Sequence, residues 1–282
     1  MTEKPPTITL NDGLVVPKIG FGTVRLKGAK GVQSISSALD NGYRLIDTAY
    51  NYENEATVGQ AIQRSSVPRE EIIVTSKLPG RYHEYDKAVY TIQESLYRAN
   101  LDYYDLYLIH WPNPKQGHFV EAWQALIDAQ KWGLIRSIGV SNFLPEHINQ
   151  LEKETGVLPS MNQVELHPYF NNRELLAWNK EKGIQVESWS PIGRKLAGDL
   201  LANETIDDIA KKYNKSITQI ILRWHIELGT IPIPGSSNTL HQRENIDVFD
   251  FTLTDQEMAR INDLTKEDGR INDQDPNVYE EF

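Results

Sequence analysis

The sequence predicts an α/β fold, a single (β/α)8 TIM barrel with an N-terminal β-hairpin and a C-terminal loop. Eight apolar, strand-like runs alternate with segments of helical periodicity, as a parallel sheet with helical crossovers requires. The length of 282 residues suits an α/β barrel, which usually has about 250 residues. No linker or low-complexity segment divides the chain, so we expect residues 1–282 to form one domain.

A hairpin is predicted first, because Asp12 and Gly13 separate the strand-like segments 7–10 and 14–16. An Asp-Gly pair readily adopts the positive φ that tight turns need. Residues 1–9 contain no apolar run long enough for a signal peptide or a membrane span. We therefore expect a cytoplasmic protein with no membrane partner.

The barrel itself is predicted from the alternation that follows. Strands are expected over residues 18–22, 44–47, 72–76, 104–110, 135–140, 161–164, 184–189 and 230–233. Helices are expected over residues 32–41, 56–64, 88–99, 119–131, 146–154, 174–182 and 217–227. The alternation alone is compatible with either a closed barrel or an open doubly wound sheet. Strands that are buried on both faces favour the closed barrel.

The last part of the chain predicts one more helix and an irregular segment. Thr254 and Glu257 have the spacing of a capping box, which predicts a helix that begins there and ends at Leu264. Residues 266–282 are polar, and we expect them to form the C-terminal loop.

Composition excludes several classes of function. The net charge is −10 and the isoelectric point about 5.2, so we expect no nucleic-acid partner. The chain has no cysteine, which rules out disulfides, thiolate nucleophiles and zinc sites with cysteine ligands. We expect no metal site, and we expect the chain to act as a monomer.

Polar residues at strand ends are the first catalytic candidates, because the active site of a barrel lies where its strands run out into the following loops. Asp47, Lys77 and His110 each close a predicted strand, and Tyr52 follows in a loop. A tyrosine phenol is a poor acid near neutrality unless a nearby cation such as Lys77 stabilises its phenolate. Asp47 would keep that lysine charged, and His110 would hydrogen-bond a substrate carbonyl oxygen.

The chain resembles the aldo-keto reductase family, including its diketogluconate- and aldehyde-reductase-like members, through motifs in a fixed order. These are GYRLIDTA (42–49), YENE (52–55), Gly59, TSKL (75–78), LIHWP (108–112), IGVSNF (138–143) and NQVELHP (162–168). The resemblance extends from the hairpin to about residue 245. It implies a catalytic tetrad of Asp47, Tyr52, Lys77 and His110, with Tyr52 as the general acid in carbonyl reduction by NAD(P)H.

The resemblance also implies a cofactor site across the barrel mouth. Ser141, Asn142 and Gln163 would hold the nicotinamide carboxamide, and Trp189 would stack on the nicotinamide ring. The other implied cofactor residues are Thr23, Asp47, Ser190, Pro191, Ile192, Arg194, Ser236, Ser237, Arg243, Glu244 and Asn245.

Cofactor choice is where the sequence departs from the family pattern. Many members place a Lys-Ser pair and a later Arg on the 2′-phosphate of NADPH, whereas this chain has Ser236, Ser237 and a histidine, His241, near the place of that Arg. Arg243 can still receive a phosphate, so we expect NADPH, with NADH use left open.

The implied substrate site consists of Val24, Tyr50, Tyr52, His110 and Trp111. Small aldehydes, dicarbonyl compounds and keto-sugar acids all remain open as substrates, because loops that one sequence does not define determine selectivity.

Two other functions are compatible with a barrel of this length. A glycosidase would need a carboxylate pair such as Glu165 and Glu187, both from late strands. A regulatory subunit would bind the cofactor with slow turnover or none. The intact tetrad argues against the second function.

Overall fold

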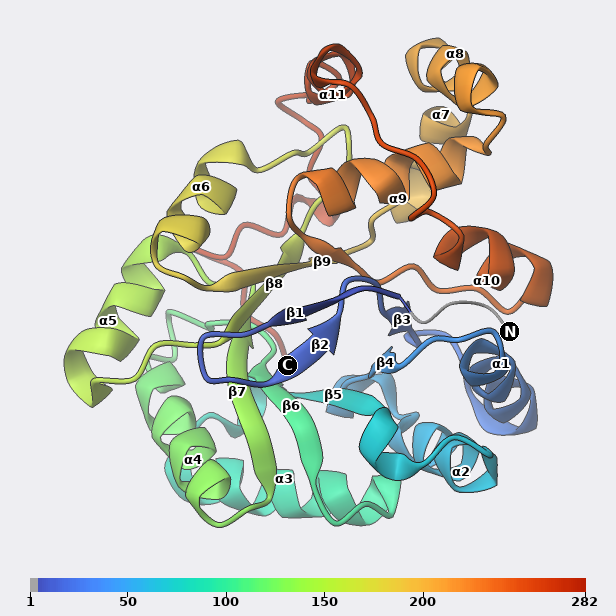
Figure 1. Cartoon of the computed structure of the whole chain (residues 1–282). Coiled ribbons are helices and arrows are strands. Elements are labelled where there is room, and N and C mark those ends of the chain that lie inside the picture. Colours follow the sequence, from blue (N-terminus) through green and yellow to red (C-terminus); the bar gives the residue numbers. More distant parts are fainter. Residues whose placement is uncertain (1–4) are drawn as a thin grey trace.

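Eight parallel strands form the inner wall of the structure, a computed structural model that describes residues 5–282 (Figure 1). Each strand pairs with the next one along the chain, in the order β3 to β10. The strands are β3 (Phe21–Gly22), β4 (Leu45–Asp47), β5 (Ile73–Leu78), β6 (Tyr104–Ile109), β7 (Ile135–Ser141), β8 (Met161–Glu165), β9 (Gln185–Trp189) and β10 (Ile231–Pro232). The predicted (β/α)8 architecture is confirmed.

Backbone hydrogen bonds between the first and last strands close the sheet into a barrel. The N–H of Gly20 donates to the carbonyl of Pro232 at 3.0 Å, and that of Gly22 donates to the carbonyl of Pro234 at 3.2 Å. A Cβ on Gly22 would lie 2.8 Å from the carbonyl oxygen of Ile233. Glycine is therefore required there, because the two backbones approach more closely than any side chain allows.

The predicted hairpin covers one end of the barrel. Strand β1 (Thr7–Thr9) pairs antiparallel with β2 (Val15–Pro17), and Gly13 in the turn has φ +94°. Leu10, Leu14 and Val16 pack against apolar strand side chains that fill the barrel interior. In Figure 1 the hairpin lies across the barrel between the viewer and the strands. This packing closes one end and leaves the carboxyl ends of the strands for the active site.

Helices surround the strands. Those that the sequence predicted are α1 (Gly28–Asp40), α2 (Glu55–Arg64), α3 (Tyr85–Ala99), α4 (Phe119–Lys131), α5 (Pro145–Thr155), α6 (Arg173–Glu181), α9 (Ile217–Glu227) and α11 (Asp255–Asn262). Thr254 and Glu257 form the expected capping box before α11. None of the helices in residues 5–282 is long and apolar enough to cross a membrane.

Three further helices lie in segments where the sequence predicted none. They are α7 (Ala197–Leu201), α8 (Glu204–Tyr213) and α10 (Thr239–Ile246). Helix α8 buries Ile206, Ile209 and Ala210 on one face, but it follows the five-residue α7 so closely that the helical period is interrupted. Helix α10 has almost no amphipathic pattern, because its buried residues include Gln242 and Asn245.

Contact between α2 and α3 depends on Gly59, which gives a first prediction. A Cβ at this position would lie 1.7 Å from the carbonyl oxygen of Ala99 at the end of α3. Gly59→Ala must therefore push the two helices apart, and we expect it to lower the free energy of unfolding by about 1–3 kcal/mol. Urea denaturation measures this change.

The matched control is Gly198→Ala in α7, where a Cβ meets nothing within 4 Å. Alanine favours a helix over glycine by roughly 0.5–1 kcal/mol, so this variant should be neutral or slightly more stable. Equal stability of the two variants would contradict the close helix contact.

Candidate active site

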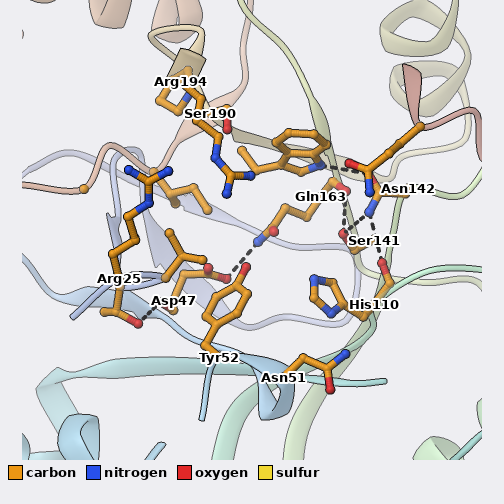
Figure 2. Close-up of a pocket in the computed structure, with 18 of the residues that line it drawn as sticks. Arg25, Asp47, Asn51, Tyr52, His110, Ser141, Asn142, Gln163, Ser190 and Arg194 are labelled. Atoms are coloured by element: carbon orange, nitrogen blue, oxygen red, sulfur yellow. Dashed lines mark hydrogen bonds between the residues drawn. The ribbon is translucent and has the colours of Figure 1, made fainter. Parts of the chain in front are cut away.

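A cavity of about 480 Å³ opens at the carboxyl ends of the barrel strands (Figure 2). Its size is typical of small-molecule sites, which span roughly 300–1,000 Å³. Most of the predicted site residues line it: Thr23, Val24, Asp47, Tyr52, His110, Trp111, Ser141, Asn142, Gln163, Trp189, Ser190, Pro191, Ile192 and Arg194. Side chains from loops far apart in the sequence therefore meet at one cavity.

A buried ion pair lies under the cavity floor. Lys77, on β5, donates from Nζ to both carboxylate oxygens of Asp47 at 2.8 and 2.7 Å and to the carbonyl of Thr48 at 2.8 Å. Neither side chain is more than 2% exposed. Burial is the largest single influence and would lower the pKa of Lys77, but the charge and hydrogen bonds of Asp47, together with the charges of Tyr52 and Glu187, outweigh it, so the pKa lies above its ordinary value. The ammonium therefore stays charged in the interior.

Tyr52 lies directly above this pair, at the end of the 3-10 helix η1 (Tyr50–Tyr52). The ammonium of Lys77 is 5.0 Å from the centre of its ring. Burial raises the pKa of Tyr52, while Lys77 opposes that rise. The phenol is thus a protonated group at neutral pH, with a cation beside it to stabilise the phenolate when the proton leaves.

His110 follows β6 and faces Tyr52 across the cavity, with the two ring centres 5.8 Å apart (Figure 2). Its Nδ1 lies 2.8 Å from a carboxylate oxygen of Glu281. Sequence reasoning missed Glu281, because this residue belongs to the segment expected only to form a loop. Asn51, which donates to Glu281 at 2.7 Å and also lines the cavity, was missed as well.

Amide and hydroxyl groups line the wall beside the indole of Trp189. Asn142 has φ +61°, and its Nδ2 donates to the hydroxyl of Ser141 and to the carbonyl of His110, each at 3.0 Å. The indole N–H of Trp189 donates to Oδ1 of Asn142 at 2.8 Å. Gln163 donates to Asp47 at 2.8 Å, which connects this wall to the ion pair.

Glu187, on β9, is buried beneath Gln163 and accepts a hydrogen bond from its amide. Burial, together with the charge of Asp47, raises the pKa of Glu187 to about 8. Near neutrality Glu187 therefore stays largely protonated, and most of the negative charge beside Lys77 comes from Asp47.

The carboxylate pair that a glycosidase would need is not formed by Glu165 and Glu187. Glu165 accepts hydrogen bonds from the backbone of Ile271 at 2.6 Å and lies 3.1 Å from Nε2 of His167. Neither glutamate lines the main cavity. Both are therefore held in the protein interior, away from the space where a glycosidic bond would be cleaved.

Two arginine side chains also line the cavity. Arg194 was predicted to line the cavity, and Arg25 was missed although it directly follows the predicted site residues Thr23 and Val24. Figure 2 shows both guanidinium groups on the same side of the cavity. Ser190 and Arg194 adopt left-handed backbone conformations with φ near +50°, which turn this loop sharply over the barrel.

Several predicted residues lie outside the cavity. The hydroxyl of Tyr50 accepts a hydrogen bond from Arg98 at 2.6 Å, so this side chain faces α3 and not the proposed substrate site. The residues expected at the 2′-phosphate and the adenine follow β10 or lie on α10, beyond the cavity: Ser236, Ser237, Arg243, Glu244 and Asn245. Arg243 is exposed and donates from Nε to Asn41 at 2.9 Å.

The cavity suits a nicotinamide dinucleotide. One wall offers the aromatic face of Trp189 beside the amides of Asn142 and Gln163, which can both donate to and accept from a carboxamide. The lining also includes Arg25 and Arg194, whose charges suit phosphate groups. No cluster of metal-ligating side chains occurs within the part of the chain that the structure describes.

Comparison with known proteins agrees with this chemistry. The model of the aldo/keto reductase family matches residues 18–266. The chain is 50% identical to 2,5-diketo-D-gluconic acid reductase B of a Corynebacterium species over 277 residues, 98% of this chain and 99% of the relative. It is 44% identical to methylglyoxal reductase DkgA of Escherichia coli K12 over 257 residues, 91% and 92% of the two chains.

A solved structure has the same fold throughout. A mutant of Gox0644 in complex with NADPH has a TM-score of 0.93 and 38% identity, covering 99% of this chain and all of the other. The family match over most of the barrel, the identities to named reductases and the tetrad geometry have one explanation: this chain belongs to the aldo/keto reductase family.

Proposed function

We propose that the enzyme reduces the carbonyl group of small aldehydes and dicarbonyl compounds with NADPH, and that Tyr52 is the general acid. The supporting observation is the position of Tyr52 at the cavity floor, above the buried Asp47–Lys77 pair. The relatives named for reduction of a diketo-sugar acid and of methylglyoxal support the substrate class. A panel of such carbonyl compounds, run with NADPH and NADH in parallel, tests it.

The cofactor would lie across the cavity. When bound, NADPH supplies the hydride that the substrate carbon receives. Ser141, Asn142 and Gln163 would orient its carboxamide, and Trp189 would hold the nicotinamide ring by stacking. Thr23, Ser190, Pro191, Ile192 and Arg194 would bind the remainder toward the pyrophosphate.

Proton transfer would proceed from Tyr52 to the carbonyl oxygen. His110, whose ring faces Tyr52, would donate a hydrogen bond to the same oxygen and place it within reach of the phenol. As the phenol loses its proton, Lys77 would stabilise the phenolate, and Asp47 would keep Lys77 charged throughout. Val24 and Trp111 would contact the rest of the substrate.

We also propose that the chain acts as a cytoplasmic monomer with one domain. Every catalytic residue named above comes from one chain, so the site needs no partner subunit. A cytoplasmic location suits an enzyme that uses a soluble metabolite as its hydride donor.

Tyr52→Phe tests the general acid. General acid catalysis contributes a factor on the order of 10² to 10⁴, and we expect a loss of that size in kcat/KM while NADPH affinity stays nearly unchanged. Steady-state kinetics and a fluorescence titration with NADPH measure the two quantities.

Tyr50→Phe is the matched control, because it removes a hydroxyl from the same 3-10 helix that is bonded to Arg98 outside the cavity. It should keep most of the turnover. A Tyr52→Phe enzyme that retains more than about a tenth of wild-type activity, with chemistry limiting the rate, would refute the assignment and leave a regulatory binding role open.

Lys77→Met tests the cation. Burial raises the pKa of Tyr52, and the ammonium of Lys77 opposes that rise. Without the ammonium, the pKa of Tyr52 should rise further. The limb of the kcat/KM pH profile that reports loss of the Tyr52 proton should then move to higher pH by at least about one unit, which equals about 1.36 kcal/mol. Profiles of the residual activity that overlay the wild type would assign Lys77 another role.

Arg243→Ala tests the 2′-phosphate site. A hydrogen bond to a charged group contributes roughly 1.5–3 kcal/mol, so NADPH binding should weaken about ten- to over a hundredfold, while NADH binding should hardly change. Added salt should likewise weaken NADPH binding more than NADH binding in the wild type.

Arg260→Ala, which removes an exposed arginine of α11 that lies near Asp208, is the control and should affect the two cofactors alike. Equal weakening of both cofactors by Arg243→Ala would instead mean that Arg243 is structural, through its bond to Asn41.

A further inference from the structure

Residues 266–282, here called the tail, bring a carboxylate into the active site. Asn113 holds the backbone of Glu281 from both sides, since its Nδ2 donates to the Glu281 carbonyl at 2.8 Å and its Oδ1 accepts from the Glu281 N–H at 3.0 Å. The ring of Tyr279 packs on Trp111 with centres 4.4 Å apart. The tail is therefore fixed to the segment that follows β6, which begins with His110.

The side chain of Glu281 is held as firmly as its backbone. One carboxylate oxygen accepts from Asn51 at 2.7 Å and lies 2.8 Å from Nδ1 of His110, and the other accepts from the N–H of Gly80 at 3.1 Å. The side chain is 9% exposed. Burial would raise the pKa of Glu281, but His110 and these donors hold it below its ordinary value. Glu281 is thus a carboxylate at neutral pH.

At 2.8 Å from a carboxylate oxygen, Nδ1 of His110 lies in the strong electrostatic field of a negative charge. A carboxylate at this distance repels the lone pair of an unprotonated Nδ1 and attracts a proton there. A neutral imidazole carries only one N–H. A proton held on Nδ1 therefore leaves Nε2, the other ring nitrogen, as a bare acceptor.

We propose that Glu281 is a positioning residue that keeps a proton on Nδ1 of His110, so that Nε2 can donate to a substrate carbonyl only when the ring is doubly protonated. The consequence for catalysis rests on the proposed function of His110. The hydrogen bond to the carbonyl oxygen then comes from an imidazolium, which is a stronger donor than a neutral imidazole. Polarisation of the substrate carbonyl therefore depends on pH, because Glu281 of the tail determines which protonation state of His110 can donate.

Other titratable and charged groups lie around His110 and Glu281 and contribute to the electrostatic field at this contact. Tyr52 stands edge-on to His110 with the Asp47–Lys77 pair beneath it, and Arg81 donates to Asn51 at 2.6 Å behind Glu281. His83 and Tyr279 also lie within the field of Glu281. Burial lowers the pKa of His83 to about 4, so His83 is neutral near pH 7 and does not compete for the carboxylate.

Nitrogen-15 NMR of the ligand-free enzyme reads the position of the proton directly, with His110→Asn used to assign the resonances. At about pH 9, where an ordinary histidine is neutral, wild-type His110 should carry its proton on Nδ1. In Glu281→Gln the amide can donate to Nδ1, so the proton should move to Nε2. A wild-type ring with its proton on Nε2 would overturn the proposal, even if the enzyme reduced no carbonyl at all.

Kinetics gives the second measurement. Wild-type kcat/KM should fall as the pH rises, because only the doubly protonated ring of His110 can donate from Nε2. In Glu281→Gln, kcat/KM should fall about tenfold less over the same pH range, equivalent to about 1.4 kcal/mol, because a neutral ring with its proton on Nε2 can still donate.

Glu280→Gln is the control, because the Glu280 carboxylate accepts from the Lys115 N–H at 2.7 Å and anchors the same tail without contacting His110. Its pH profile should follow the wild type. If Glu281→Gln and Glu280→Gln share one profile and one His110 tautomer, the tail has only a structural role.

Discussion

The buried ion pair between Asp47 and Lys77 determines how the rest of the active site works. Removal of one partner from such a pair typically costs about 3–5 kcal/mol, because the other charge is left uncompensated in the interior. The neutral state of Glu187, imposed by burial and by Asp47, keeps a second negative charge away from Lys77. The ammonium can therefore act on Tyr52, whose phenol stays protonated at neutral pH because burial raises its pKa.

The barrel supplies this arrangement by holding each group on a different rigid strand. Asp47 ends β4 opposite Thr75 of β5, and Lys77, two residues beyond Thr75 on the same face of that strand, is near enough for its long side chain to reach the carboxylate. The closure of the barrel at Gly22 also holds β4 in place, because β3 pairs with β4 on one side and meets the end of β10 on the other. Only glycine allows the first and last strands to approach so closely. Substrate-facing loops can then vary without disturbing the ion pair.

The sequence predicted the site residues whose positions are determined by the ends of the barrel strands. Asp47, Lys77 and His110 were predicted because the carboxyl ends of parallel strands meet at one end of the barrel. Matches to family motifs likewise located the amide and hydroxyl groups at the end of β7 and within β8. Glu281 could not be predicted, because Asn113, 168 residues earlier in the chain, holds it in place. Tyr50 was expected in the substrate site, yet one turn of 3-10 helix points it toward Arg98 and Tyr52 toward the cavity.

The central claim is that Lys77, kept charged by Asp47, acts electrostatically on Tyr52. Carbon-13 NMR of ring-labelled tyrosine in the ligand-free enzyme, with the Tyr52 resonance assigned by its absence in Tyr52→Phe, measures the pKa of this one phenol without any turnover. The account predicts that the pKa of Tyr52 is higher in Lys77→Met than in the wild type by at least about one unit. Equal Tyr52 pKa values in the two proteins would contradict it.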